Sequence, residues 1–286
     1  MTERIVLAGA SGFIGEYLAT AFTADGAEVA RIGRSGPGAQ WGDTDRIVEL
    51  LDGADLVINL AGKSVNCRYH ADNRRELLRS RVDTTDELAR AIGRCVSPPP
   101  LWINASTATI YRHAEDRPMT ESTGEIGEGF SVGVATAWED ALFAADLPRT
   151  RRVALRMAIV LGDGSALIPL LRLTRLGLGG PQLDGRWPAT RERLRAGTYH
   201  RFGARGGTQK FSWVHIADVL GIIRFLREHP EVAGPVNTVS PNPSDNRTLM
   251  AILRRSLRMP FGLAARRWML ELGAVAIRTE TELILK

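Results

Sequence analysis

The sequence predicts an α/β fold in which a doubly wound parallel sheet is joined to a smaller C-terminal lobe. Three observations predict it: short apolar runs typical of buried strands, intervening segments with apolar residues at helical spacing, and a glycine-rich turn after the first run. Such alternation is typical of βαβ units, whose strands lie parallel. The predicted strands are residues 4–8, 28–32, 56–60, 101–105 and 153–161, and the predicted helices among them are 13–24, 74–92 and 134–145.

The alternation weakens after Gly162, which predicts a division into two domains. Residues 1–162 form the parallel-sheet domain, to which strands from later segments can return, and residues 163–286 form the smaller lobe. Residues 182–210 are rich in arginine and glycine and show little periodicity, so we expect a long insertion there. Further helices are expected at 166–176, 216–227 and 248–257, and a further strand at 235–239.

The composition excludes several classes of protein. Hydrophobic residues make up 44% and charged residues 24% of the 286 residues, as in an ordinary globular protein. No apolar run approaches the roughly 20 residues that span a bilayer, and the N-terminus lacks the pattern of a signal peptide. With two cysteines, Cys67 and Cys95, a disulfide framework is not expected. These observations predict a cytoplasmic protein that has no membrane partner.

The net charge is +5, and nearly all of the positive charges are arginines, since the only lysines are Lys63, Lys210 and Lys286. A basic chain can bind nucleic acid, but no helix-turn-helix, zinc-finger or RNA-binding signature accompanies this charge. Arginine also pairs well with phosphate and carboxylate groups. We therefore expect a small-molecule substrate, with an anionic one as a candidate, and no nucleic acid. No residue spacing indicates a metal site.

The strongest local signal is the turn Gly9-Ala10-Ser11-Gly12-Phe13-Ile14-Gly15 between the first predicted strand and the first predicted helix. Its early glycines let the backbone turn tightly and approach a diphosphate, and its last glycine allows close packing of helix on strand. The start of the helix then directs free N–H groups at the phosphates. This context predicts a Rossmann domain that binds a dinucleotide through Gly9, Ser11, Gly12, Phe13, Ile14 and Gly15.

The end of the second predicted strand bears on the choice between NAD(H) and NADP(H). An acidic residue there would accept a hydrogen bond from the ribose 2′-hydroxyl of NAD. This sequence instead has Arg34 and Ser35, a cation and a hydroxyl that suit a 2′-phosphate. The sequence therefore favours NADP(H), with NAD(H) as the alternative.

Several segments together resemble the extended short-chain dehydrogenase/reductase superfamily, and more closely its NAD-dependent epimerase/dehydratase-like subgroup. The resemblance covers nearly the whole chain and implies a nicotinamide cofactor and often a homodimer built through two helices per subunit. It is carried by the glycine turn, Asn59-Leu60-Ala61-Gly62, Ala105-Ser106-Thr107-Ala108-Thr109-Ile110-Tyr111, Ser80-Arg81-Val82, Ala137-Trp138-Glu139, Leu155-Arg156, Gly177-Leu178-Gly179-Gly180-Pro181, Trp213-Val214-His215-Ile216-Ala217-Asp218 and Asn237-Thr238-Val239-Ser240-Pro241.

The resemblance also implies roles for particular residues. Thr107 falls on the position of the superfamily's catalytic Ser or Thr, whose hydroxyl contacts a substrate oxygen. The segment of Asn59, Leu60, Ala61 and Gly62 would lie beside the riboses of the cofactor. Lys63, Ser106 and Met157 complete the expected cofactor-binding set, Met157 at a strand end near the nicotinamide.

The sequence departs from the superfamily at its Tyr-x-x-x-Lys pair, in which Tyr is the general acid/base and Lys lowers its pKa. Alignment on Trp138 and Glu139 puts Ser131 at the Tyr position and Ala135 at the Lys position, and residues 125–148 contain neither Tyr nor Lys. A serine hydroxyl does not replace Tyr unaided. The remaining candidates for proton chemistry are Tyr111, which could equally be a core residue, and His215, which could equally bind backbone at a helix start.

Two functions follow from these observations. The first is an NADP(H)-dependent oxidoreductase or epimerase-like enzyme with a non-standard acid/base, acting on an unidentified small molecule whose charge Arg68 and Arg81 could neutralise. The second is a catalytically silent NADP(H)-binding sensor or interaction module. The missing Tyr and Lys favour the second, and the retained Thr107 strand favours the first.

Overall fold

The computed structural model describes residues 2–164, 167–199, 203, 206–276 and 281. Within these residues the main sheet has seven strands in the order β10-β6-β5-β4-β1-β2-β3, and every pairing is parallel. The predicted doubly wound fold is confirmed. The strands are β1 (Arg4–Ala8), β2 (Glu28–Gly33), β3 (Ala39–Gln40), β4 (Leu56–Asn59), β5 (Leu101–Thr107), β6 (Arg151–Met157) and β10 (Gly234–Thr238).

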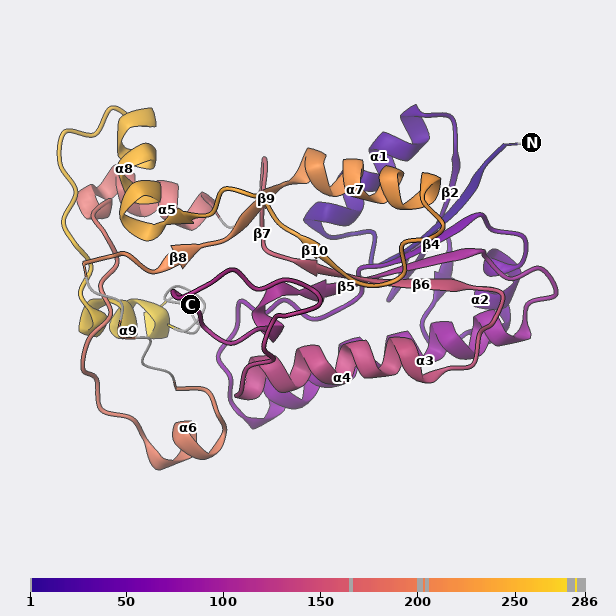
Figure 1. The fold of residues 1–286 in the computed structure, drawn as a ribbon, viewed down its shortest axis with the longest axis horizontal. Helices are drawn as coiled ribbons and strands as arrows, with labels where there is room; N and C mark the ends of the chain where they lie inside the picture. Colours follow the sequence, from indigo (N-terminus) through magenta and orange to yellow (C-terminus); the bar gives the residue numbers. More distant parts are fainter. Residues whose placement is uncertain (1, 165–166, 200–202, 204–205, 277–280, 282–286) are drawn as a thin grey trace.

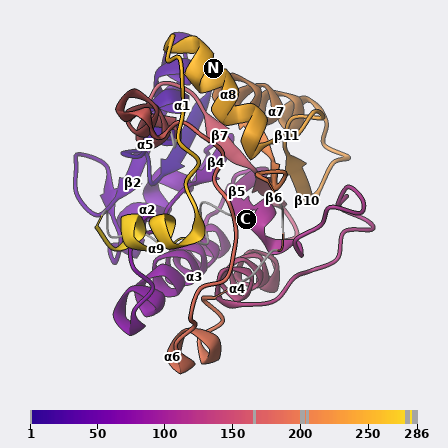
Figure 2. The ribbon, with the colours of Figure 1, turned by 90° about the vertical axis from the view of Figure 1, so that its left-hand side faces the viewer.

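Helices cover both faces of this sheet, as Figures 1 and 2 show. One apolar cluster joins the sheet to the helices on the first face and includes Leu18, Phe22 and Ile223, all 0% exposed. A second cluster, with Ile47, Leu88 and Trp102, fills the other face. The first face carries α1 (Phe13–Ala24) and α7 (Ile216–Glu228), and the second carries α2 (Thr44–Leu51), α3 (Ala71–Arg94) and α4 (Phe130–Ala144).

The predicted strand 153–161 is in fact two strands, β6 and β7 (Ile159–Leu161), which belong to different sheets. The break is at Ala158, whose N–H still donates to the carbonyl of Thr238 in the main sheet. The next N–H, of Ile159, donates to Ser212, and β7 continues beside β9 (Trp213–His215). The run 153–161, apolar except for Arg156, thus conceals a change of partner strand, because the strands of both sheets are built from the same apolar residue types.

The remaining elements gather at one end of the molecule, around the insertion (Figure 1). The insertion contains a short helix. Arg267 holds the insertion through an ion pair with Asp184 at 2.8 Å and also pairs with Glu271 at 2.8 Å, and all three side chains are nearly fully buried. The division into domains at residue 162 stays a prediction. Beyond that residue, β10 belongs to the main sheet and α7 packs against it. The elements gathered at this end are α5 (Leu167–Leu173), η2 (Thr174–Leu178), α6 (Arg191–Arg195), β8 (Lys210–Phe211), β11 (Ser244–Asp245), α8 (Asn246–Ser256) and α9 (Arg267–Ala276). The short helix η1 (Ala108–Ile110) follows β5 and packs against α4 and β6.

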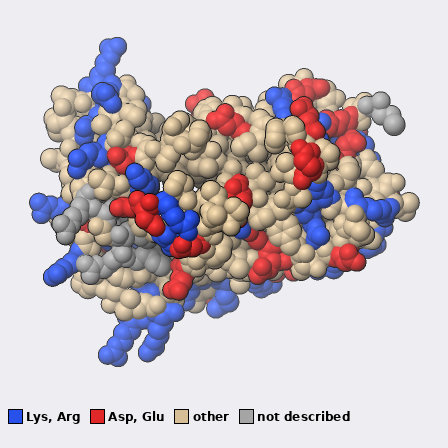
Figure 3. All heavy atoms as spheres, in the orientation of Figure 1, with Lys and Arg blue, Asp and Glu red and all other residues tan. Residues whose placement is uncertain are grey.

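Positive side chains are prominent at the same end. Figure 3 shows Lys and Arg projecting from the region of α6 and α8, while both signs of charge alternate over the rest of this face. The last turns of these helices carry Arg193, Arg195, Arg254 and Arg255, where positive charge complements the helix dipole. Among the described residues, no helix combines the length and the apolar character that crossing a membrane requires.

Candidate dinucleotide-binding and catalytic site

The glycine turn has the geometry that a phosphate-binding turn requires. Gly9 has a φ of +76°, and its N–H donates to the carbonyl of Ile32 at 2.9 Å. A Cβ on Gly9 would lie 2.7 Å from the backbone nitrogen of Ala61, and one on Gly15 would lie 2.6 Å from the Cα of Ala10. A Cβ on Gly12 would meet nothing nearer than 3.8 Å. Two glycines therefore serve close packing, whereas Gly12 borders open space.

The start of α1 presents backbone donors to that space. Gly12 is the N-cap and provides no side-chain hydrogen bond to the first turn, and both Gly12 and Ser11 are exposed. Uncapped N–H groups at a helix N-terminus carry partial positive charge and bind anions. Phe13 and Ile14 lie half-buried at the base of the turn, and Ile14 packs against the core.

The turn lies at the point where the sheet reverses its winding. From β1 the chain continues through β2 to β3 on one side, and from β4 through β5 and β6 to β10 on the other. In doubly wound sheets the ligand crevice lies beyond the carboxyl ends of the two strands at this switch point, here β1 and β4. Arg34 and Ser35, directly after β2, are both exposed near this edge.

Asn59, at the end of β4, is fully buried and supports the loop that follows it. Its side-chain oxygen accepts from the N–H of Ala61 at 3.0 Å, and its nitrogen donates to Asn104 at 2.7 Å and to Thr85 at 3.2 Å. Leu60 is held to β1 by its N–H, which donates to Ala8 at 2.8 Å. The sequence-predicted Asn59 side chain is therefore committed to protein groups.

The next two residues of this loop face α3. Gly62 is exposed, and the side chain of Lys63 pairs with Glu76 at 2.7 Å. The N–H of Lys63 donates to the Ser80 hydroxyl at 2.9 Å. Hydrogen bonds and an ion pair thus fix the loop between the end of β4 and α3.

The structure places Thr107, Met157 and Thr238 in one row across the ends of β5, β6 and β10. The Thr107 hydroxyl accepts from the N–H of Thr109 at 3.1 Å, and this bond leaves its own proton available for donation. Met157 is half-buried against the core. Ser131, in the first turn of α4, is half-buried and makes no side-chain hydrogen bond within the described part of the chain.

Tyr111 belongs to a buried polar chain that sequence reasoning did not find. Its hydroxyl accepts from Arg156 at 2.8 Å and donates to the side-chain oxygen of Asn237 at 2.9 Å. Arg156 also pairs with both oxygens of Glu139, at 2.9 and 2.7 Å. Glu139 in turn accepts from the Ser106 hydroxyl at 2.5 Å. Hydrogen bonds to Glu139 and then to Tyr111 raise the pKa of Arg156.

A charge inside an apolar run was the signal for this chain of contacts. In β6, Arg156 interrupts the apolar end of the strand, and in α4 Glu139 follows Trp138 and precedes Asp140. Charged residues in such positions are rarely buried unless they are paired. The hydroxyls of Ser106, a predicted cofactor-binding residue, and of Tyr111, a candidate for proton chemistry, both take part in this chain of contacts, here called the Glu139 network.

His215 lies elsewhere and caps α7. Its Nδ1 accepts from the N–H of Ala217 at 3.2 Å, and the residue is exposed. Ile216, which follows it, borders Gly162 together with Phe13 of the glycine turn. No hydrogen bond links His215 to Thr107, Tyr111 or Ser131 in the part of the chain that the structure describes.

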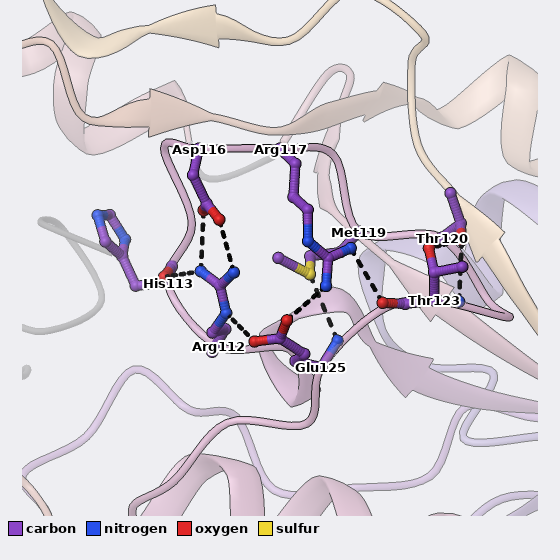
Figure 4. A network of polar contacts seen from close by, with 8 residues as sticks. All are labelled: Arg112, His113, Asp116, Arg117, Met119, Thr120, Thr123 and Glu125. Atoms are coloured by element: carbon purple, nitrogen blue, oxygen red, sulfur yellow. Dashed lines mark hydrogen bonds and ion pairs between the residues drawn. The ribbon is translucent and has the colours of Figure 1, made fainter.

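A loop after η1, residues 112–126, is closed by the ion pairs in Figure 4. Arg112 donates to both oxygens of Asp116, at 2.9 and 2.8 Å, and also pairs with Glu125. Arg117 donates to the other oxygen of Glu125 at 2.5 Å. The hydrogen bonds from Arg112 hold the pKa values of the Asp116 and Glu125 carboxyls below their usual range.

Two further segments border the site. The N–H of Asn237 donates to the Glu121 carboxylate at 2.6 Å, which joins loop 112–126 to β10. The insertion reaches the start of α4, where Phe130 donates its N–H to the carbonyl of Gly197 at 3.1 Å. The insertion therefore lies next to Ser131, a position that no local sequence pattern indicated.

Comparison with known proteins supports the resemblance seen in the sequence. The NAD dependent epimerase/dehydratase family matches residues 5–240 of the chain. The epimerase family protein SDR39U1 of Bos taurus is 33% identical over 92% of this chain and 82% of its own length. The epimerase family protein YfhF of Bacillus subtilis is 28% identical over 91% of this chain and 82% of its own length.

A solved structure agrees with these sequence relatives. The human epimerase family protein SDR39U1, whose crystal structure is with NADPH, superposes with a TM-score of 0.78 at 26% identity, over 99% of this chain and 88% of that one. MoeE5, in complex with UDP-glucose and NAD, has a TM-score of 0.70 at 21% identity and shows a shared fold. From the family match and these relatives, the chain belongs to the NAD dependent epimerase/dehydratase family.

Proposed function

We propose that this protein is an NADP(H)-dependent oxidoreductase or epimerase-like enzyme acting on a small molecule. The observation that carries the proposal is the uncapped start of α1 beside open space at the switch point between β1 and β4. Such a site suits a diphosphate. The similar human protein was crystallised with NADPH, which supports the same cofactor here.

Recognition of the extra phosphate of NADP(H) falls to Arg34 and Ser35. A guanidinium makes charge-assisted hydrogen bonds to phosphate, and the hydroxyl adds a donor. No carboxylate stands at the end of β2 to accept a hydrogen bond from the ribose 2′-hydroxyl of NAD(H), since β2 ends at Gly33 and is followed by Arg34 and Ser35. We expect NADP(H) to bind more tightly than NAD(H) for this reason.

The bound cofactor would supply the hydride chemistry, and the chain would orient the substrate. Thr107 would donate its hydroxyl proton to a substrate oxygen, because its acceptor side already holds the N–H of Thr109. Tyr111 would hold neighbouring side chains in place and would not transfer a proton, since its hydroxyl already accepts from Arg156 and donates to Asn237. A water molecule admitted beside Ser131 would complete the proton transfer.

A silent NADP(H)-binding module is the second candidate. The observation that favours it is that the Tyr111 hydroxyl is committed to the Glu139 network, and that the Nδ1 atom of His215 caps α7. In that case the cofactor would bind with the same preference, but no carbonyl compound would accept its hydride.

Calorimetric titration with NADPH and NADH tests the cofactor proposal. We expect NADPH to bind at least about tenfold more tightly, a difference of about 1.4 kcal/mol, and Arg34→Gln to abolish that preference. Equal affinities in the unmodified protein would contradict it. Loss of absorbance of bound NADPH on addition of nucleoside-diphosphate sugars or simple carbonyl compounds would then favour the enzyme over the silent module.

A further inference from the structure

Thr85, on α3, carries a buried hydroxyl that accepts two hydrogen bonds. Its Oγ1 accepts from the indole N–H of Trp138 on α4 at 3.1 Å and from the side-chain nitrogen of Asn59 at 3.2 Å. Thr85 is 0% exposed and Trp138 is 6% exposed. Because a hydroxyl oxygen has two lone pairs, these two donors use its whole capacity as an acceptor. The Thr85 hydroxyl therefore links α4 to the end of β4.

The Thr85 hydroxyl helps to fix the orientation of the Asn59 amide. The Nδ2 atom of Asn59 has two protons, of which one goes to Thr85 and the other to the Oδ1 atom of Asn104 at 2.7 Å. The Oδ1 atom of Asn59 accepts from the N–H of Ala61 at 3.0 Å. A flipped amide would turn its NH₂ group toward the N–H of Ala61, so that two donors would face each other. The contacts of Asn59 thus determine where the backbone of Ala61 is held.

The backbone of Ala61 packs directly against the phosphate-binding turn. A Cβ on Gly9 would lie 2.7 Å from the nitrogen and 2.8 Å from the Cα of Ala61. The N–H of Gly9 is held from the other side by the carbonyl of Ile32 at 2.9 Å. A displaced Ala61 would therefore displace the turn that directs the N–H groups of α1 at the diphosphate. Binding sites require their groups to be held to within about 0.5 Å.

The adjacent residues Trp138 and Glu139 of α4 belong to two different networks. Glu139 accepts from Ser106 in the Glu139 network, whereas Trp138 donates to Thr85. Asn104 and Ser106 lie two residues apart in β5 and so on one face of the strand. One turn of α4 thus stabilises the Glu139 network through one side chain and the loop after β4 through the other.

We propose that Thr85 and Trp138 are positioning residues for the dinucleotide. They fix the amide of Asn59, which holds Ala61 against Gly9 and so keeps the phosphate-binding turn in the geometry that binds the diphosphate. Both side chains are buried, so they act on the ligand only through Asn59 and Ala61. This inference rests on the proposed function, since it requires a bound dinucleotide.

Thr85→Val tests this role, because valine keeps the shape of threonine and removes the acceptor of both hydrogen bonds. The matched control is Thr150→Val. Thr150 is 4% exposed, and its hydroxyl donates to the carbonyl of Pro99 at 2.8 Å, just before β6 and so at the opposite edge of the sheet. We expect Thr85→Val to weaken NADPH binding at least about tenfold and Thr150→Val to leave it unchanged. Both variants lose a buried hydroxyl, so a general loss of stability would act on both alike.

Two further variants grade the effect. Trp138→Phe removes the indole N–H and keeps an aromatic ring, and we expect it to weaken NADPH binding about threefold. Thr85→Ser keeps the hydroxyl, and we expect its NADPH affinity to stay within about twofold of that of the unmodified protein. Calorimetry measures the affinities, and each variant is first checked by its melting temperature. If Thr85→Val does not fold, Trp138→Phe and Thr85→Ser take its place in the comparison.

Three results would overturn the role of Thr85 and Trp138. They are unchanged NADPH affinity in a folded Thr85→Val or Trp138→Phe variant, an equal loss of affinity in Thr150→Val, and a loss in Thr85→Ser as large as that in Thr85→Val. An unmodified protein that does not bind NADPH would instead overturn the proposed function.

Discussion

The two halves of the sheet's carboxyl edge use polar groups in opposite ways. At β1 and β4 the donors are backbone N–H groups at the start of α1, with no side chain capping them. At β5, β6 and β10 the polar groups are side chains, and the Glu139 network joins them to one another. The first half keeps its backbone donors free for a ligand. In the second half the members of the Glu139 network bind one another, and the Thr107 hydroxyl keeps its proton available.

This difference predicts which substitutions destabilise the fold and which only weaken ligand binding. Removing a member of the Glu139 network leaves a buried partner unsatisfied, so the free energy of unfolding should fall. Filling the space before α1 disturbs no existing contact, so only ligand binding should suffer. Four experiments test that contrast.

Glu139→Ala should have the largest effect on stability. It leaves Arg156 buried without its carboxylate, which we expect to lower the free energy of unfolding by about 3–5 kcal/mol. Urea denaturation measures this loss. The control is Glu49→Ala, which breaks the exposed 2.5 Å pair with Arg46 and should cost at most about 1 kcal/mol. Similar losses in the two variants would remove the distinction between buried and exposed pairs.

Gly12→Ala should leave the fold intact and weaken NADPH binding at least about tenfold. Its methyl group would meet no protein atom nearer than 3.8 Å and would enter the space that we assign to the diphosphate. The matched variant is Gly15→Ala, whose methyl would lie 2.6 Å from Ala10 and should destabilise the protein by about 1–3 kcal/mol. Melting temperature and calorimetry together distinguish them, and full NADPH affinity in Gly12→Ala would refute the site.

Tyr111→Phe sharpens the assignment of this residue to the fold. The change removes the acceptor for Arg156 and the donor to Asn237, so we expect a loss of about 1–2 kcal/mol in the free energy of unfolding. NADPH affinity should not change. Unaltered stability would show that the Tyr111 hydroxyl is not needed for the fold and is available for proton transfer.

Acid should loosen loop 112–126 with the smallest effect of the four. The pKa of Asp116 is below its usual 3.8 in the folded protein, so its contribution to stability is present above about pH 4 and is lost as the pH falls. Because this network is exposed, the effect should be local. Hydrogen exchange of the loop, corrected for intrinsic rates, should quicken between pH 6 and pH 3. Asp116→Asn should exchange faster already at pH 6, and equal protection in both proteins would argue against the ion pairs.

The sequence predicted the elements whose signals are local. The glycine turn, its strand and its helix lie within residues 4–24, and spacing alone identified them. The break between β6 and β7 was missed because it depends on Ser212 and β9, far along the chain. The start of α4 at Phe130 was missed as well. Its N-cap, Gly129, has a φ of +104° and meets the insertion at Gly197, a tertiary contact.

The candidate site likewise has a part that local sequence predicted and a part that depends on tertiary contacts. Residue types and spacing determined where a dinucleotide would bind, because a phosphate-binding turn is made of backbone over seven consecutive residues. Only the tertiary structure decided that Tyr111 is held by Asn237, 126 residues away, and that Arg81 lies against Gly62. Such contacts depend on which strands and helices become neighbours, and that choice is made by packing of the whole core rather than by any local pattern.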